Sequence, residues 1–179
     1  FGLILALHRR YGRAFSSVAS GAWDRDACRG EELRGNKVGI IGLGRVGYRV
    51  AAYCSAFDAE VAWCDPADVP SEPEWLRLAD VPSVISASRV VVLCASHRPG
   101  QSPLFGEREI AALAGRYFVN TSRGELVDER ALLAALRENL LAGAAVDVIA
   151  DETGNNRLEE WRALLPRTNL ILTPHIGGA

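Results

Sequence analysis

The sequence predicts an α/β protein: a Rossmann-type doubly wound parallel sheet with helices on both faces, preceded by an N-terminal helical arm. From Lys37 onward, short apolar runs alternate with helical segments, which is the pattern of a sheet built from strand–helix–strand units. The runs are nearly continuous in Val, Ile and Leu, as expected of strands buried on both faces. A glycine-rich turn joins the first run to the first of these helices, where doubly wound folds bind nucleotides.

The individual elements follow from the periodicity of the apolar residues. Residues 3–15 carry apolar side chains at helical spacing with arginines between them, and they predict one amphipathic helix. We assign residues 1–30 to an arm outside the core and residues 31–179 to a dinucleotide-binding domain. Asp128 is expected to cap the helix that follows it. The predicted strands are 37–41, 60–64, 75–77, 89–94, 116–120, 144–149 and 170–173, and the predicted helices of the domain are 45–57, 79–86, 107–114, 128–138 and 157–164.

Composition excludes several classes of protein. The 179 residues are 49% apolar and 23% charged, which excludes a disordered or collagen-like chain. The net charge is −2, and the scattered lysines and arginines predict no basic surface for nucleic acid. No apolar run reaches the roughly 18 residues of a membrane span. We therefore expect a globular protein that binds neither nucleic acid nor membranes.

The cysteines and the chain ends carry further expectations. The four cysteines show no C-x-x-C spacing and predict reduced core thiols of a cytoplasmic protein, with disulfides as the alternative and no metal site. The chain contains no Met, begins at Phe1 and ends directly after an apolar run, so we expect a piece of a longer polypeptide. The cysteines are Cys28, Cys54, Cys64 and Cys94.

The motif GLGRVG at residues 42–47 predicts a dinucleotide site, because it follows an apolar strand and opens a helix. Gly42 allows the tight turn, Gly44 lets a pyrophosphate approach the backbone, and Gly47 lets the helix pack closely on the strand. The phosphates would then meet free amides at a helix N-terminus. The residues predicted to bind the cofactor here are Gly42, Gly44, Arg45, Val46 and Gly47.

An acidic residue completes this motif. Asp65 ends the second predicted strand, eighteen residues after Gly47, where a carboxylate accepts hydrogen bonds from an adenosine ribose. Its charge would repel a 2′-phosphate, so the expected cofactor is NAD rather than NADP. The alternative interpretation of Asp65 and Pro66 is a plain turn.

Three polar residues follow three later strands. Arg123, Glu152 and His175 come after the strands at 116–120, 144–149 and 170–173, and the carboxyl ends of parallel strands share one edge of the sheet. We therefore expect the three side chains to converge beside the nicotinamide. A histidine can take the hydroxyl proton during hydride transfer, a carboxylate can orient the imidazole, and an arginine can pair bidentately with a substrate carboxylate.

Each of these residues also has a simpler interpretation. Arg123 alone would be a solvated loop charge, Glu152 a surface residue and His175 a core histidine bonded to a backbone carbonyl. Only their joint placement at the nucleotide edge favours catalysis. His8 and His97 lack matching partners in the sequence pattern and are interpreted as structural or solvated.

At these residues the sequence resembles the NAD-binding domain of the D-isomer-specific 2-hydroxyacid dehydrogenase family. The resemblance covers nearly the whole chain and lies in GIIGLGRVG (39–47), VNTSRGELVDERAL (119–132), AAVDVIADE (144–152) and TPHIGG (173–178). It implies that Arg123 binds the substrate carboxylate and carbonyl, that His175 is the acid/base, and that Glu152 is its partner. It further implies cofactor contacts at Cys94, Thr121, Ser122, Arg123, Asp147 and His175.

Two functions remain open at this point. The first is an NAD-dependent oxidoreductase that acts on the CH–OH of a D-2-hydroxy acid, or reduces the 2-oxo acid in reverse. The second is an NAD(H)-responsive regulatory or corepressor-type protein on the same fold. The resemblance implies a substrate domain absent from this chain, so we expect the isolated chain to be inactive. It also implies a homodimer formed through the arm, with Trp23 as an interface anchor or, alternatively, as a buried intrachain tryptophan.

Overall fold

The computed structural model describes residues 1–67, 69, 75–154, 157–165 and 168–178. Within these residues seven parallel strands form one sheet in the order β3-β2-β1-β4-β5-β6-β7. The strands are β1 (Lys37–Ile41), β2 (Glu60–Cys64), β3 (Leu76–Arg77), β4 (Val90–Leu93), β5 (Tyr117–Asn120), β6 (Gly143–Val146) and β7 (Leu170–Leu172). The helices are α1 (Gly2–His8), α2 (Tyr11–Ala19), α3 (Arg45–Ala56), α4 (Val81–Ala87), α5 (Glu107–Ala112), α6 (Glu129–Arg137) and α7 (Leu158–Leu164), with a 3₁₀ turn η1 (Gly124–Leu126).

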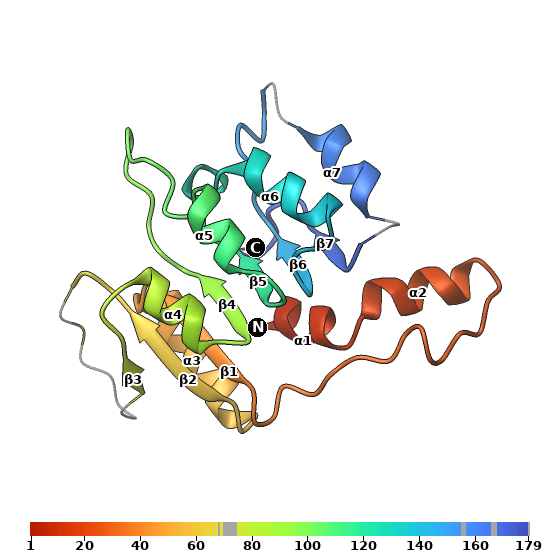
Figure 1. The fold of residues 1–179 in the computed structure, drawn as a ribbon, viewed down its shortest axis with the longest axis horizontal. Helices are drawn as coiled ribbons and strands as arrows, with labels where there is room; N and C mark the ends of the chain where they lie inside the picture. Colours follow the sequence, from red (N-terminus) through yellow and green to blue (C-terminus); the bar gives the residue numbers. More distant parts are fainter. Residues whose placement is uncertain (68, 70–74, 155–156, 166–167, 179) are drawn as a thin grey trace.

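The strand order confirms the doubly wound parallel fold. From β1 the chain moves outward to β2 and β3, and then it returns across β1 to β4 and continues to the opposite edge (Figure 1). The direction of winding therefore reverses between β1 and β4, which is the switch point where such sheets bind ligands.

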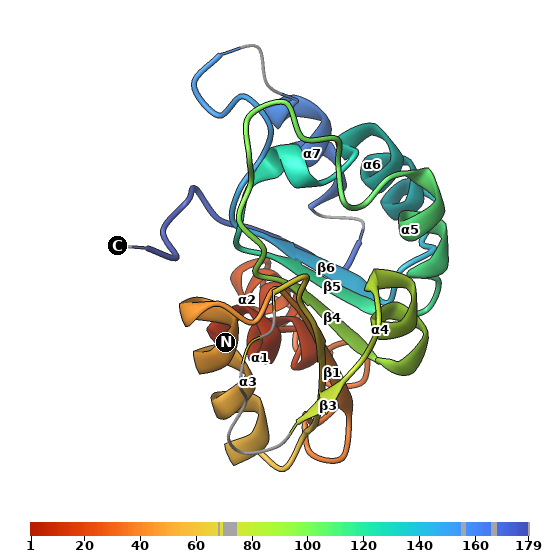
Figure 2. The same ribbon diagram turned by 90° about the vertical axis from the view of Figure 1, so that its left-hand side faces the viewer.

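Helices cover both faces of the sheet. Helices α1 and α3 lie on one side, and α4, α5 and α6 lie on the other (Figure 2). Each helical layer packs against the strands and forms a separate apolar cluster. Trp63 belongs to the cluster on the α1–α3 side, and Phe105, Phe118 and Trp161 belong to the other. The strand residues are largely buried, as their continuous apolar character predicts.

The N-terminal arm differs from its prediction in two respects. The predicted helix 3–15 is two helices, because Arg10 adopts a left-handed conformation with φ 52° between α1 and α2. The assignment of residues 1–30 to an arm outside the core is wrong for α1: Ile4 and Leu7 are fully buried in the apolar cluster on the sheet face that α1 and α3 share. Helix α1 covers β5, β6 and β7, whereas α3 covers β1 and β2.

Beyond α1 the arm is exposed. Helix α2 contains no buried residue, and Trp23 is 88% exposed, so the alternative of a buried intrachain tryptophan is wrong. Of the other two residues left as structural or solvated, His8 is buried and His97 is partly exposed.

Smaller differences concern the ends of elements. The predicted strand 144–149 ends at Val146, because the chain leaves the sheet at Asp147. Asp128 caps α6 as expected, and its carboxylate accepts the amide of Ala131 at 3.1 Å. The four cysteines are free thiols. Burial raises the pKa of Cys54 to about 12 and that of Cys64 and Cys94 to about 11, so these thiols are protonated at neutral pH.

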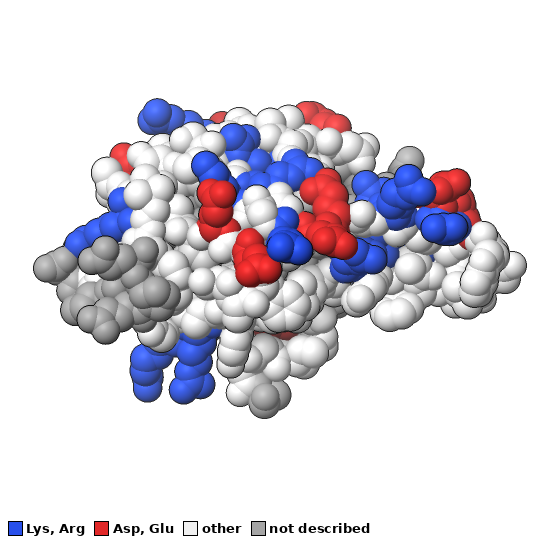
Figure 3. All heavy atoms as spheres, turned by 90° about the horizontal axis from the view of Figure 1, so that it is seen from below, with Lys and Arg blue, Asp and Glu red and all other residues white. Residues whose placement is uncertain are grey.

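The surface carries mixed charge. Acidic and basic side chains are interspersed over the face seen from below (Figure 3). Among the described residues no helix has both the length and the apolar character that crossing a bilayer requires. These residues also contain no group of three or more His, Cys, Asp or Glu side chains suited to hold a metal ion.

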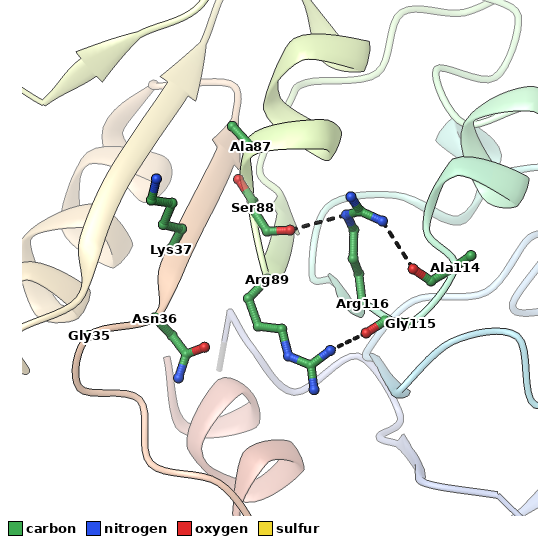
Figure 4. Close-up of a pocket in the computed structure, with 9 residues that line it drawn as sticks. All are labelled: Gly35, Asn36, Lys37, Ala87, Ser88, Arg89, Ala114, Gly115 and Arg116. Atoms are coloured by element: carbon green, nitrogen blue, oxygen red, sulfur yellow. Dashed lines mark hydrogen bonds between the residues drawn. The ribbon is translucent and has the colours of Figure 1, made fainter.

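A cavity of about 440 Å³ lies at the amino ends of β1, β4 and β5, the opposite edge of the sheet from the switch point (Figure 4). Arg116 makes several hydrogen bonds in the wall of this cavity. Its guanidinium donates to the carbonyl oxygens of Ile85 (2.8 Å) and Ser88 (3.2 Å) at the end of α4, and to those of Ala112 (3.1 Å) and Ala114 (3.0 Å) at the end of α5. One side chain thus caps the carboxyl ends of two helices, and the cavity is part of the scaffold.

Candidate active site

The turn between β1 and α3 contains three glycines in three different surroundings. Gly42 has φ 91°, and a Cβ there would lie 2.7 Å from the backbone of Ala95. A Cβ at Gly47 would lie 2.0 Å from the carbonyl oxygen of Gly42, so the start of α3 packs directly on the turn. A Cβ at Gly44 would meet nothing within 4 Å. Gly42 thus makes the turn and Gly47 allows the close packing that the motif predicts, while the space beside Gly44 is open and its approach to a pyrophosphate stays a prediction.

The amino end of α3 is available to an anion. Gly44 is its N-cap, and no side chain in the described part of the chain caps it. Arg45 and Val46 form the first turn, with Val46 59% exposed. The start of a twelve-residue helix without a side-chain cap suits the pyrophosphate of a dinucleotide, so the residues present fit this cofactor.

Asp65 braces this turn. Its Oδ2 accepts the amide of Leu43 at 2.8 Å, and its Oδ1 accepts the amide of Ala67 at 2.8 Å. The bond to Leu43 joins the end of β2 to the glycine turn across 22 residues, and nothing in the sequence pattern indicated it. Asp65 thus stabilises a turn, which was the alternative interpretation, and its contact with a ribose stays a prediction.

Cys94, directly after β4, lies against the same turn. Its amide donates to the carbonyl of Ile41 at 2.8 Å, and its carbonyl carbon would be 3.0 Å from a Cβ on Gly42. The predicted cofactor residues at Cys94 and at the glycine turn are therefore neighbours at the switch point.

His175 and Glu152 meet as the sequence predicts. They follow β7 and β6, and the His175 Nδ1 lies 2.8 Å from the Glu152 Oε2. Both side chains are accessible, with 42% and 37% exposure respectively. His175 and Asp151, the residue before Glu152, both adopt left-handed conformations, with φ of 54° and 53°. Such conformations are uncommon for residues other than glycine, although Arg10, Asp58 and Asn139 adopt them outside this site.

Asp147 holds His175 in place. Its carboxylate accepts the Thr173 hydroxyl at 2.5 Å and the amides of Ile176 at 3.0 Å and Gly177 at 2.8 Å. Its own carbonyl accepts the amide of His175 at 2.8 Å. Asp147 is only 2% exposed. It therefore fixes the turn that aims His175 at Glu152, whereas its predicted contact with the nicotinamide is untested.

The hydrogen bonds also set the charge of Asp147. Burial raises the pKa of its carboxyl, but the bonds from Thr173, Gly177 and Ile176 and the nearby His175 outweigh burial, and the pKa lies below its ordinary value. Asp147 is therefore ionised at neutral pH.

Arg123 stands on a braced turn after β5. The buried Asn120 accepts the amide of Ser122 and donates to the carbonyl of Arg123, each at 3.0 Å. Thr121 lies between these braced residues. The Ser122 hydroxyl donates to the carbonyl of Ala95, which ties the turn to the segment after β4. Asn120 escaped the sequence analysis because it reads as the last residue of a strand.

Gly124 brings the Arg123 turn against the segment that leads to Glu152. A Cβ on Gly124 would lie 2.1 Å from the carbonyl carbon of Ile149 and 2.3 Å from the amide nitrogen of Ala150. Only glycine fits this approach. The structure thus joins Glu152 directly to His175 and places the Arg123 turn beside the chain that carries Glu152.

This geometry defines a class of protein: an α/β domain with a glycine turn at its switch point and an imidazole–carboxylate pair at the same edge of the sheet. A family model described as the D-isomer specific 2-hydroxyacid dehydrogenase NAD-binding domain matches residues 1–177. The chain belongs to this family, and it is an NAD-binding domain.

Relatives and solved structures agree with this assignment. The chain is 34% identical to D-3-phosphoglycerate dehydrogenase of Archaeoglobus fulgidus over 180 residues, covering 99% of the chain and 33% of that protein. It is 32% identical to glyoxylate reductase of Thermofilum pendens, covering 99% of the chain and 54% of that protein. The structure of D-lactate dehydrogenase from Aquifex aeolicus complexed with NAD and lactic acid superposes with a TM-score of 0.89 at 28% identity, covering 98% of this chain and 57% of that chain.

The chain is shorter than these relatives. It spans between 33% and 54% of the length of the curated proteins named above. The relatives are therefore larger proteins, of which this chain corresponds to the NAD-binding part.

Proposed function

We propose that the whole protein interconverts a D-2-hydroxy acid and the corresponding 2-oxo acid with NAD, and that this chain supplies the cofactor site and the three reacting side chains. The observation that carries the proposal is the 2.8 Å contact between His175 and Glu152 at the cofactor edge of an NAD-binding domain. A regulatory protein on this fold would need the cofactor site but not an accessible acid–base pair.

The roles follow from the contacts. Glu152 engages the Nδ1 of His175, so Nε2 is the nitrogen that receives the hydroxyl proton during oxidation and returns it during reduction. Bound NAD would supply the acceptor for the hydride that leaves the carbinol carbon. Arg123 is the proposed partner of the substrate carboxylate and adjacent carbonyl: its turn lies beside the Glu152 segment, and its exposed guanidinium donates to the Ser122 carbonyl at 2.7 Å, leaving further donors for a ligand.

The substrate class is a small 2-hydroxy or 2-oxo acid. The relatives include enzymes named for 3-phosphoglycerate, glyoxylate and lactate, which share a 2-hydroxy or 2-oxo carboxylate unit. We propose that Arg123 recognises this common unit and that specificity comes from parts of the protein beyond this chain. The isolated chain is accordingly proposed to bind NAD without turning over substrate.

The complete protein tests the role of His175. Changing His175→Asn should lower kcat for reduction of 2-oxo acids by a factor on the order of 10²–10⁴, as expected when a general acid is lost. The Kd for NADH should change less than about threefold, because the glycine turn is untouched. His97→Asn, at a partly exposed histidine of the segment after β4, is the matched control and should leave kcat unchanged.

The measurement is initial velocity over a panel of 2-oxo acids, with NADH binding followed by fluorescence. Equal losses in turnover and in cofactor affinity would assign His175 a structural role instead. Turnover of none of the acids by a complete protein that binds NADH would favour the regulatory alternative.

We further propose a cytoplasmic homodimer. The four free thiols suit a reducing compartment. Helix α2 and the residues after it expose Tyr11, Phe15, Val18 and Trp23, and a row of large apolar side chains on one arm is typical of an interface. A groove of about 710 Å³ between α2 and β7 adds a concave surface next to this row.

A further inference from the structure

The last turn of α1 contains a histidine that the proposed reaction does not use. His8 is completely buried, and its ring lies 4.3 Å, centroid to centroid, from the ring of Tyr117 on β5. Neither ring nitrogen of His8 has a hydrogen-bond partner within the described residues. Buried polar atoms are nearly always satisfied, so such an imidazole calls for a physical account.

The charged and titratable groups that face His8 come from three places. Tyr117 lies on β5, Arg89 comes directly before β4, and Glu31 lies on the segment before β1. Glu31 is already engaged: its Oε1 accepts from the Arg89 guanidinium at 2.7 Å, and its Oε2 accepts from the Arg89 Nε at 3.4 Å. The Arg89 guanidinium also lies 4.9 Å from the centroid of the Tyr117 ring. A charged His8 would thus stand beside an arginine and compete with it for one carboxylate.

The backbone around His8 joins the end of α1 to two other segments of the chain. The His8 carbonyl accepts the amide of Glu31 at 2.9 Å, and a Cβ on Gly30 would lie only 2.2 Å from that same oxygen. One residue earlier, the Leu7 carbonyl accepts the Asn169 side chain at 3.4 Å. The end of α1 is therefore held by the chain that returns to β1 and by the chain that enters β7.

We propose that His8 is a proton-sensitive latch: α1 stays docked on the sheet while the imidazole is neutral, and uptake of one proton favours local release of α1. The step involves no other chemistry. The released imidazole is solvated and keeps the proton, whereas the docked imidazole is completely buried and has no hydrogen-bond partner among the described residues.

The direction of the pH dependence follows from linkage. Burial lowers the pKa of His8 below its ordinary value, Glu31 acts against this and Arg89 adds to it. An exposed histidine takes up its proton near pH 6.5, so the released state binds more protons than the docked state below that pH. Docking of α1 is fully stable above about pH 6.5 and weakens as the pH falls toward the lower pKa of the buried group.

Amide hydrogen exchange of the 179-residue chain tests the latch, with rates corrected for the intrinsic chemistry at each pH. Protection of the α1 amides should fall by up to about tenfold per pH unit below about 6.5, the limit for one proton. Protection of β4 and β5 should stay constant over the same range, because they do not depend on the latch. In His8→Phe, which keeps a ring on Tyr117, protection of α1 should not change with pH; His97→Asn should behave as the original chain does.

Several outcomes would overturn the latch. One is constant protection of α1 in the original chain, and another is the same slope in His8→Phe as in the original. A uniform loss of protection in all elements would show global unfolding instead. His8→Gln provides a neutral variant of similar polarity if His8→Phe does not fold. A magnetic resonance titration showing that His8 protonates near pH 6.5 while α1 stays protected would also contradict the proposal.

Discussion

At the scale of single residues, the candidate site consists of the side chains proposed to react and the side chains that hold them. The residues proposed to react could be found from the sequence, because Arg123, Glu152 and His175 each follow a strand. The holding residues could not, since the bonds of Asp147 to Ile176 and Gly177 span about 30 residues and exist only once β6 and β7 are paired. For Asp147 itself, the family resemblance implied a cofactor contact and not these hydrogen bonds to the turn that carries His175.

Asp147 should make the stability of the chain depend on pH in acid. Because its pKa is lower in the folded chain than its ordinary value, its stabilising contribution is complete above about pH 3.9 and is lost as the pH falls through the folded pKa. Asp147→Asn should therefore lower the free energy of unfolding by about 1–3 kcal/mol at pH 7, as expected when buried amides lose an acceptor. The difference from the original chain should shrink toward pH 2.

Urea unfolding at pH 7 and at about pH 2–3 measures both quantities. Asp26→Asn is the control, because that carboxylate is 88% exposed and its ion pair with Arg29 lies at the surface. A deficit in Asp147→Asn that is as large in acid as at neutral pH would refute the assigned charge.

At the scale of elements, the position of a helix depends on tertiary contacts, which the periodicity of its sequence does not predict. The apolar spacing of residues 3–15 runs through Arg10 without a break, so the pattern predicts one helix. The structure has two, since the chain turns at Arg10 after α1 has packed Ile4 and Leu7 on the sheet. Strands β1, β2 and β4 were predictable almost to the residue, because long apolar runs between turn residues leave few alternatives.

Arg116 should stabilise α4 and α5 together. Its guanidinium bonds to carbonyls at the end of both helices, where unpaired carbonyls and the helix dipoles favour a positive charge. Arg116→Met keeps the apolar stem and removes the donors, and it should lower the free energy of unfolding by about 1–3 kcal/mol.

Chemical denaturation measures the total loss, and hydrogen exchange shows where protection is lost. Arg108→Met, at an exposed position on α5, is the matched control and should change stability by less than about 0.5 kcal/mol. If the two variants lose equal stability, Arg116 does not join the two helices.

At the scale of the whole molecule, the topology predicts where the site lies. All strands are parallel and the winding reverses at β1, so the ends of β4 to β7 and the glycine turn meet at one edge. This could be inferred before any side chain was placed. The position of the arm could not be inferred in this way. The periodicity of an amphipathic helix does not show whether the helix packs on its own sheet or on another chain.

The exposed arm should mediate self-association. Phe15→Asp, at a side chain that is 70% exposed on α2, should convert a dimer into a monomer, since a charge cannot be buried at an apolar interface without a partner. Tyr53→Asp, at a 52% exposed aromatic residue on α3, is the control and should leave the dimer intact.

Sedimentation equilibrium over a range of protein concentrations separates the two states. A chain that is monomeric at about 100 μM, or a Tyr53→Asp variant that dissociates as readily as Phe15→Asp, would argue against the arm as the interface.

The bond from Asp65 to Leu43 also constrains any redesign of coenzyme preference. A small neutral residue at this position would remove the charge that we expect to oppose a 2′-phosphate, but it would also remove the acceptor that holds the glycine turn, the expected diphosphate site. Asp65→Asn retains an oxygen for the Leu43 amide while dropping the charge. Engineering this domain toward NADPH therefore begins by keeping an acceptor at residue 65, and Asp65→Ala would confound selectivity with loosening of the loop.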